Sequence, residues 1–360
     1  MYEIPVERPW NERSEYEAFQ RVLDEAVLAD KLGFHSFWTV EHHFLAEFSH
    51  SSAPEVLYGA IAARTENIRI GHGVRLLPFP YNHPVRAAEQ AATVDLLSGG
   101  RLEFGTGRSV SGIELGGFGI DPDATRGLWK EAIDIIVQAW TKDVLEWESE
   151  NFTIPPREVV PKPFQRPHPP LWGATGSVDG HEMMGRMGLG LLSFALAVPI
   201  EDLHHRLALY RKGLEHADPV GEFVNAQAGT FTMVHCNETT ERAVETARAS
   251  FEQYIRKSIH LVATVAELLE GKPLGTYDYT EQALMAERSG MLDKIRMDDL
   301  VGMNAVIAGD PDQCIEMAKK YEEAGVDILL CMVQPGGIPH EDVVRSIELL
   351  GEHVLPAFRK

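Results

Sequence analysis

Two adjacent histidines beside a carboxylate are the first residues in this sequence that could do chemistry. They lie in FWTVEHHFLAEF (37–48), where Glu41, His42, His43 and Phe44 follow a short apolar run. Imidazole gains and loses a proton near neutral pH and is also a common metal ligand. Adjacent side chains of an extended segment point to opposite faces, so His42 and His43 cannot both reach one pocket, and no HExxH-like spacing lies nearby. A metal pair is therefore disfavoured, which leaves one inward imidazole for proton transfer or two ordinary hydrogen-bonded histidines.

Two further stretches combine small residues with a group that can bind an anion. In RLEFGTGRSVSG (101–112), Gly107 lets backbone amides approach a ligand, and Arg108 offers a planar fork that suits phosphate. In GATGSVDGHE (173–182), Ser177 opens a predicted helix whose free N–H groups attract an anion. Taken separately, the first stretch is equally a turn with a solvated arginine and the second a plain serine N-cap. Together they predict a clamp for one phosphate.

Segments with helical periodicity alternate with short apolar runs along the chain, and this pattern must position those residues. Strands are predicted near 1–5, 35–40, 67–78, 101–107, 170–175, 189–194, 226–235 and 326–333. Helices are predicted near 14–32, 53–65, 83–100, 124–140, 177–188, 199–216, 238–256, 310–325 and 340–358, with a Pro-rich insertion at 155–170. Repeated βα units form either a closed barrel or an open doubly wound sheet.

The number of units favours the barrel. Eight strands suit an α/β (β/α)₈ barrel, and the best dinucleotide-binding candidate, GTGRSV (105–110), lacks the third glycine of that fingerprint. In such barrels the chemistry lies at the carboxyl ends of the strands. The histidine pair and both anion-binding stretches follow predicted strands, so we expect them to meet at one barrel mouth.

Composition excludes several classes of partner. The chain has 360 residues, with 33 Lys and Arg against 54 Asp and Glu, and its net charge of -21 would repel nucleic acid and anionic membranes. No apolar stretch approaches the ~20 residues that span a bilayer, so a soluble, cytoplasmic protein is expected. Cys236, Cys314 and Cys331 are far apart and suit neither a disulfide framework nor a metal site. No metal is expected.

Taken together, these stretches resemble the bacterial luciferase-like, flavin-dependent monooxygenase family. The matching segments cover almost the whole chain in order, at 32–56, 68–109, 171–192 and 307–359. EHHF, HPVRAAEQAATVDLLSGGRLEFGTGR and GGIPHEDVVRSIELLGEHVLPAFR are the most specific matches. The resemblance implies a single barrel domain over residues 1–360, in which the irregular segment 258–300 is a mobile lid over the active site.

The resemblance also assigns roles to individual residues. His42 takes the place of the family's catalytic histidine, and Glu41 or His43 would orient it. Cofactor-binding positions are implied at Gly73, Val74, Gly107, Arg108, Ala174, Thr175, Gly176 and Ser177, with a cis peptide bond between Gly73 and Val74. Apart from the resemblance, Trp38, Phe44 and Phe79 are candidates to line the substrate pocket, with packing as core aromatics as the alternative. The reactive cysteine of bacterial luciferase falls on Gly107, so light emission is not expected.

The implied reaction is a two-component oxygenation. A separate flavin reductase would supply reduced FMN, which reacts with O₂ through a flavin C4a-peroxide and oxygenates a small organic substrate in a dry pocket. The resemblance further implies a homodimer. Two alternatives stay open: an oxidoreductase that transfers hydride with a deazaflavin cofactor, and a flavin-binding protein without turnover.

Overall fold

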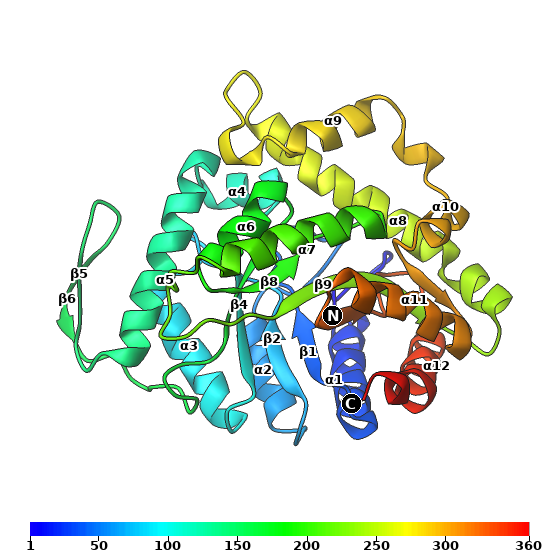
Figure 1. The fold of residues 1–360 in the computed structure, drawn as a ribbon, viewed down its shortest axis with the longest axis horizontal. Coiled ribbons are helices and arrows are strands. Elements are labelled where there is room, and N and C mark those ends of the chain that lie inside the picture. The colour runs from blue at the N-terminus through cyan, green and yellow to red at the C-terminus, as the bar shows by residue number, and fades with distance from the viewer. Residues whose placement is uncertain (360) are drawn as a thin grey trace.

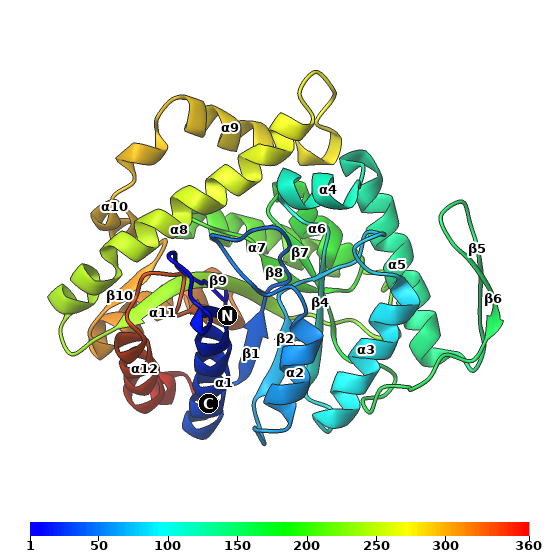
Figure 2. The ribbon, with the colours of Figure 1, turned by 180° about the vertical axis from the view of Figure 1, so that it is seen from behind.

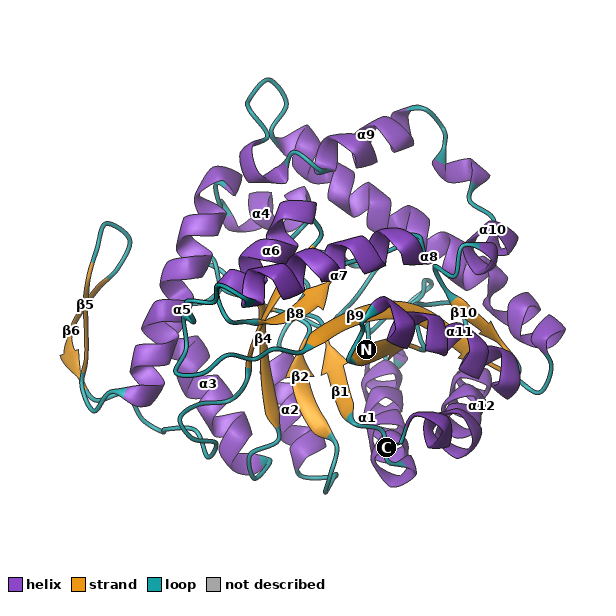
Figure 3. Cartoon of the chain, in the orientation of Figure 1, coloured by secondary structure: helices purple, strands orange, loops and turns teal. Residues whose placement is uncertain are grey.

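The centre of the molecule is a parallel sheet that curves into a nearly closed barrel, as Figure 3 shows in a computed structural model that describes residues 1–359. Its strands are β1 (Ser36–Thr39), β2 (Arg69–His72), β3 (Arg75–Leu76), β4 (Leu102–Gly107), β7 (Leu171–Thr175), β8 (Gly190–Ser193), β9 (Ala228–Cys236), β10 (Ile307–Gly309) and β11 (Ile328–Met332). They pair in the order β1, β2, β4, β7, β8, β9, while β3 pairs with β4 and both β10 and β11 pair with β9.

The N-terminal residues lie in the gap between β1 and β11. Tyr2 forms a parallel bridge to Thr39 of β1, and the amino group of Met1 donates a hydrogen bond to the carbonyl of Cys331 in β11 (2.8 Å). The first predicted strand is therefore present as a single bridge. With it, the eight predicted strands surround one axis, and the predicted (β/α)₈ barrel is confirmed.

Helices cover the outside of the barrel. They are α1 (Ser14–Leu32), α2 (Pro54–Ala62), α3 (Pro84–Leu97), α5 (Thr125–Thr141), α6 (Val178–Arg186), α7 (Ile200–Leu214), α8 (Thr240–Leu268), α11 (Pro311–Ala324) and α12 (His340–Leu349). Gly33 and Gly325 end α1 and α11 in the left-handed conformation (φ 81° and 100°), which glycine adopts most easily. Trp38 and Trp172 pack edge to face (ring centroids 5.5 Å apart) in the core between strands and helices.

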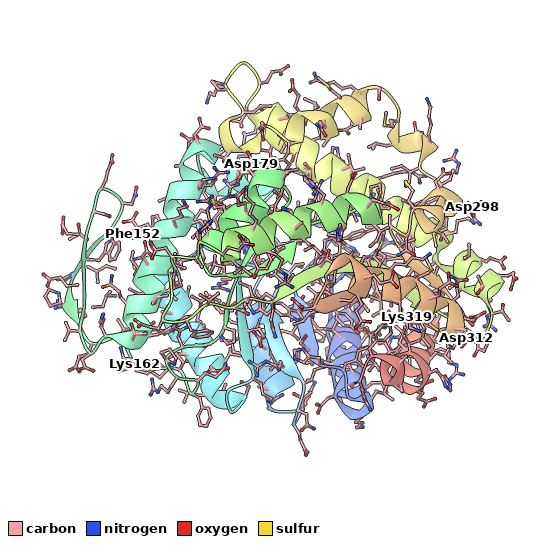
Figure 4. All side chains as sticks on the ribbon, in the orientation of Figure 1. Phe152, Lys162, Asp179, Asp298, Asp312 and Lys319 are labelled. Atoms are coloured by element: carbon pink, nitrogen blue, oxygen red, sulfur yellow. The ribbon has the colours of Figure 1, made fainter. Side chains whose placement is uncertain are left out.

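Several elements differ from the expectation. The predicted strand 67–78 is divided into β2 and β3, and its two parts meet at the peptide bond between Gly73 and Val74, which is cis as the resemblance implies. A short helix, α4 (Gly112–Phe118), follows β4 where no helix was predicted. An antiparallel hairpin, β5 (Leu145–Glu148) and β6 (Thr153–Arg157), precedes the remainder of the Pro-rich insertion. It projects from one side of the barrel in Figure 1, and Figure 4 labels Phe152 in it.

The segment 258–300 is more ordered than its composition suggested. Its first part belongs to α8, which continues to Leu268 rather than ending near residue 256. The remainder forms η2 (Gly275–Tyr277), α9 (Thr280–Arg288), η3 (Leu292–Lys294) and α10 (Met297–Gly302). Seen from the front and from behind, α8 and α9 lie across one end of the barrel, close to α4 (Figures 1 and 2).

Two short helical segments, η4 (Leu350–Val354) and η5 (Leu355–Phe358), follow α12, and η1 (Pro122–Ala124) precedes α5. In the part of the chain that the structure describes, no helix combines the length and the apolar character needed to cross a membrane.

Candidate active site

A cavity opens at the carboxyl ends of the strands, beneath α8 and α9. Of the residues singled out in the sequence, it is lined by Glu41, His42, Gly73, Val74, Gly107, Arg108, Ala174, Thr175, Gly176 and Ser177. These residues follow β1, β2 and β4 or end β7, and the strands lie side by side in the sheet. The stretches expected to meet at the mouth of the barrel are therefore brought together.

The two histidines point in different directions. His42 lines the cavity with a side chain that is 17% exposed. His43 is not among the lining residues, and its ring stacks on Tyr81 (centroids 6.0 Å apart, 16° between planes) and meets Phe118 edge to face. The alternation expected of an extended segment is confirmed, and only His42 is placed to act on a bound molecule.

Glu41 does not orient His42. Its carboxylate is buried, receives a hydrogen bond from the backbone N–H of Leu76 (3.0 Å), and lies 3.2 Å from Nε2 of His43 and 3.6 Å from Arg75. Burial alone would raise the pKa of Glu41, but Arg75 and these hydrogen bonds outweigh it and lower the pKa. Glu41 thus connects the segment after β1 to β3 through its contacts with Arg75 and Leu76.

Glu114 of α4 is the residue that orients His42, and sequence reasoning missed it. The Nδ1–H of His42 donates to Oε1 of Glu114 (3.0 Å), and the backbone N–H of His43 donates to the same oxygen (2.9 Å). The hydroxyl of Ser109 donates to Oε2 (2.7 Å). The only sequence signal is Ser111 three residues before Glu114, a capping-box spacing that would have been taken as a helix start.

His42 lies between two carboxyl groups. Besides Glu114 at Nδ1, Oε1 of Glu3 lies 3.8 Å from Nε2. Burial alone would lower the pKa of His42, but Glu114 and Glu3 reverse this and raise the pKa to about 9. The ring is therefore protonated near neutral pH.

Arg108 and Arg126 also line the cavity, and the charge of one acts on the other. Arg108 donates to the hydroxyls of Thr125 (3.2 Å) and Thr276 (2.8 Å), and its guanidinium lies over the ring of Tyr277 (4.8 Å). The Nε of Arg126 is buried without a hydrogen-bond partner among the described residues. Burial and the neighbouring charge of Arg108 lower the pKa of Arg126. No motif or spacing linked Arg126 to the site in the sequence.

The N-terminus of α6 lines the same cavity. Ser177 caps the helix by accepting a hydrogen bond from the N–H of Gly180 (3.2 Å), and Asp179 in Figure 4 marks the first helical turn. Because β4 and β7 are neighbours, Arg108 and Ser177 reach the same cavity. Two guanidinium groups and a helix N-terminus form a donor set that fits a phosphate group.

Gly107 lets Val74 pack closely against the end of β4. A Cβ atom at position 107 would come within 2.4 Å of Cγ2 of Val74, the second residue of the cis peptide bond. The two guanidinium groups and the N-terminus of α6 fit the phosphate of a cofactor that lies in this cavity. Within residues 1–359, no three His, Cys, Asp or Glu side chains come together in a way that could hold a metal ion.

The aromatic residues expected to line the pocket lie elsewhere. Trp38 is fully buried behind the strands, against Trp172. Phe44 (61% exposed) contacts Phe118, and Phe79 (46% exposed) lies against the β5–β6 hairpin. The aromatic lining instead consists of Phe48, Trp129, Phe194, Phe231, Tyr254 and Tyr279. Residue type alone did not indicate which aromatic rings would face the cavity.

Comparison with known proteins places this fold and site in a family. A family model described as luciferase-like monooxygenase matches residues 5–328, so the chain belongs to the luciferase-like monooxygenase family and is an oxygen-incorporating oxidoreductase. The oxygenase component of the flavin-dependent trigonelline monooxygenase of Acinetobacter baylyi is 23% identical, over 99% of this chain and 94% of that protein. The alkanal monooxygenase alpha chain of Photobacterium leiognathi is 26% identical, over 95% and 94%.

Solved structures agree in fold. A monooxygenase from Streptomyces bottropensis superimposes with a TM-score of 0.76 at 26% identity, over 99% of this chain and 98% of that one. The oxygenating constituent of 3,6-diketocamphane monooxygenase from Pseudomonas putida, in complex with FMN, has a TM-score of 0.75 at 19% identity, over 98% and 96%. An F420-dependent secondary alcohol dehydrogenase has 0.71 at 19%, over 99% and 96%. At 19% identity the likeness concerns the fold alone.

Proposed function

We propose that this protein binds reduced FMN at the mouth of the barrel and uses O₂ to oxygenate a small organic substrate. The observation that carries the proposal is one cavity with a phosphate-binding end, at Arg108, Arg126 and Ser177, and a proton-transferring end, at His42 and Glu114. Membership of the luciferase-like monooxygenase family supports it.

FMN suits the basic end better than a deazaflavin does. FMN ends in a phosphate monoester, which carries up to two negative charges, whereas the phosphate of coenzyme F420 is a diester with one, and its other charges lie on carboxylates farther along the tail. Arg108 and Arg126 form no salt bridge among the described residues, so both guanidinium groups are available to bind a phosphate. Matching a dianion with two guanidinium groups gives the more complete neutralisation.

Bound FMN would supply the oxygen activation expected from the sequence, and the protein supplies position, enclosure and a proton. Arg108, Arg126 and the N-terminus of α6 hold the phosphate. The cover formed by α8 and α9 keeps water from the strand ends, which limits wasteful release of hydrogen peroxide. His42, with Nδ1 bonded to Glu114, exchanges a proton from its other nitrogen.

The remaining expectations belong to the same proposal. A separate flavin reductase supplies reduced FMN, consistent with the trigonelline relative being named an oxygenase component. The segment from α8 to α10 opens and closes as a lid, the protein works in the cytoplasm, and it forms a homodimer.

A deazaflavin-dependent hydride transfer is the second candidate, because an F420-dependent dehydrogenase shares the fold. Its reaction would need no O₂. A flavin-binding protein without turnover is the third candidate and would bind flavin but form no oxygenated product.

Titration with cofactors separates the three candidates. Oxidised and reduced FMN and F420 are each titrated into the protein, and the reduced complexes are then mixed with O₂ and a panel of small aldehydes, ketones and terpenes. We expect tighter binding of FMN than of F420, and product formation that depends on O₂. Preference for F420 with turnover in the absence of O₂ would contradict the proposal and favour the second candidate. Tight FMN binding with hydrogen peroxide as the only product, across the panel, would favour the third.

A further inference from the structure

Glu3 is a buried carboxyl group of the cavity to which the proposed function gives no role. It is 1% exposed and lines the cavity beside His42. Its Oε1 accepts a hydrogen bond from the hydroxyl of Tyr254 (3.1 Å), whereas Oε2 is buried without a hydrogen-bond partner among the described residues. Buried polar atoms nearly always have a partner, so an unpaired carboxyl oxygen beside this histidine calls for an explanation.

Glu3 and Glu114 approach the two ring nitrogens of His42 from different parts of the chain. Glu114, on α4, is hydrogen-bonded to Nδ1, and Glu3, in the N-terminal segment, lies 3.8 Å from Nε2. The oxygens of Glu114 also accept hydrogen bonds from the hydroxyl of Ser109 and the backbone N–H of His43. These bonds fix the position of the Glu114 carboxylate. A negative group on each side of an imidazole favours its protonated form.

The other titratable groups near this pair are engaged or uncharged. Glu41 acts on His42 electrostatically, but its oxygens are hydrogen-bonded elsewhere. Burial raises the pKa of the Tyr254 phenol well above its usual value, so it remains a hydrogen-bond donor. Burial lowers the pKa of the Met1 amino group to about 5, which leaves it uncharged at neutral pH. Burial also raises the pKa of Glu3, and His42 opposes this effect.

We propose that Glu3 keeps His42 protonated, so that His42 donates a proton during oxygenation rather than removing one. Glu3 acts through His42 and is therefore a positioning residue. Glu114 is hydrogen-bonded to Nδ1 of His42, so the Nε2–H of His42 remains available to donate a proton. The inference rests on the proposed function, because it concerns the direction of proton transfer in that reaction.

The overall reaction requires such a donor if reduced FMN binds as its anion. It is FMNH⁻ + O₂ + S + H⁺ → FMN + SO + H₂O, where S is the substrate. The flavin loses two electrons, one oxygen atom forms a bond to the substrate, and the other leaves as water. The Nε2–H bond of His42 breaks, its proton completes an O–H bond of that water, and the ring recovers a proton from solvent when the cavity opens.

The first test measures His42 in the protein without cofactor. NMR titration of histidine-labelled protein gives the proton-binding constant of His42, whose signal is assigned by its loss in His42→Gln. The titration compares the wild type, Glu3→Gln and the control Glu25→Gln. Glutamine keeps the size of Glu3 and an oxygen for Tyr254 but carries no charge. Glu25 is a matched control, because it is a buried glutamate that contacts another histidine outside the cavity.

We expect Glu3→Gln to lower the proton-binding constant of His42 by about tenfold or more, and Glu25→Gln to leave it within about twofold. An equal constant in the wild type and in Glu3→Gln would overturn the inference. Should Glu3→Gln fail to fold, Tyr254→Phe removes the hydroxyl that stabilises the Glu3 anion. It is expected to shift the titration of His42 in the same direction by a smaller factor, and no shift would count equally against the inference.

The second test follows the reaction against pH. Reduced FMN bound to the protein is mixed with O₂ and substrate in a single turnover. A proton donor predicts that the rate falls as pH rises through the pKa of His42. It also predicts that this midpoint moves to lower pH in Glu3→Gln, while the dependence of the rate on substrate concentration stays the same. A rate that increases through the same midpoint would show that His42 acts as a base. If no substrate is oxygenated, the proposed function fails, while the NMR titration still decides whether Glu3 holds the proton.

Discussion

The two ends of the cavity differ in how completely their charges are compensated. At the histidine end, His42 is hydrogen-bonded to Glu114 and faces Glu3, so positive and negative groups already stand in contact. At the arginine end, Arg108 has hydroxyl and aromatic neighbours and the Nε of Arg126 has no hydrogen-bond partner, and neither forms a salt bridge among the described residues. The charges at the histidine end are neutralised within the protein, whereas those at the arginine end could be neutralised by the proposed phosphate.

This difference separates binding from chemistry within one pocket. Guanidinium groups without a salt bridge have most to gain from a phosphate, whereas a ring held by a hydrogen bond to Glu114 keeps one orientation for proton transfer. Substitutions at the two ends should therefore affect different quantities. A substitution that changed FMN affinity and product formation equally would contradict this division.

The largest effect is expected at the histidine end. His42→Ala removes the proton-transferring ring, and we expect the yield of oxygenated product per reduced FMN to fall by about 10²–10⁴-fold, with FMN binding unchanged. Product analysis in single turnovers measures this. His35→Ala, at the other end of β1, is the control and should behave as the wild type. Unchanged coupled product formation in His42→Ala would remove His42 from the mechanism.

Substitutions at the arginine end should change the affinity for FMN. Arg108→Ala removes a charge-assisted contact, and we expect FMN binding to weaken by about 1.5–3 kcal/mol, while the binding of riboflavin, which has no phosphate, stays the same. Calorimetric titration with both flavins checks this. Arg186→Ala, on the exposed far end of α6, is the control. Equal FMN affinity in Arg108→Ala would show that the phosphate lies elsewhere.

The free energy of unfolding should depend on pH because His42 loses its proton as the pH rises. Its pKa is raised to about 9 in the folded protein from 6.5, so its stabilising contribution is complete below pH 6.5 and is lost as the pH rises through 9. We expect the difference in free energy of unfolding between the wild type and His42→Gln to shrink by on the order of 1–3 kcal/mol over that interval. Urea unfolding at several pH values measures it. A constant difference would mean that the ring is not held as a cation.

The smallest effect is expected where the cover meets the arginine end. Thr276→Val removes the hydroxyl that accepts a hydrogen bond from Arg108 but keeps the side-chain shape. This bond positions Arg108 and does not itself contact the phosphate, so FMN affinity should fall by less than the about 1.5–3 kcal/mol expected for Arg108→Ala. Thr93→Val, on the exposed face of α3, is the control. A loss as large as that of Arg108→Ala would make the cover part of the phosphate site.

The sequence predicted the barrel and the meeting of three strand-end stretches, because periodicity and strand-end positions depend on local residues. Alternation along an extended segment also predicted that only one of His42 and His43 would face the cavity, and the family resemblance indicated that it would be His42. It did not predict Glu114 or Arg126, whose partners lie 72 and 18 positions away, at His42 and Arg108. No local pattern distinguishes a helix-capping glutamate from one that holds a distant ring.

The misplaced aromatic residues have the same origin. Trp38, Phe44 and Phe79 are close in sequence to chemistry-bearing residues, yet one lies in the core and two are exposed. The rings that line the cavity come from six separate parts of the chain, between Phe48 and Tyr279. Which rings meet depends on how strands and helices pack, and a single sequence does not reveal this.

By itself, then, the sequence determined the repeated strand and helix units, the family resemblance, and the residues His42, Arg108 and Ser177 at the barrel mouth. These follow from short-range periodicity and from contiguous motifs. Only the tertiary structure decided that His42 lies between Glu3 and Glu114, that Arg126 joins Arg108, and that α8 contacts Glu3 while η2 contacts Arg108. Those contacts join residues far apart in the chain, and the free energy that holds them together exists only once the barrel has closed.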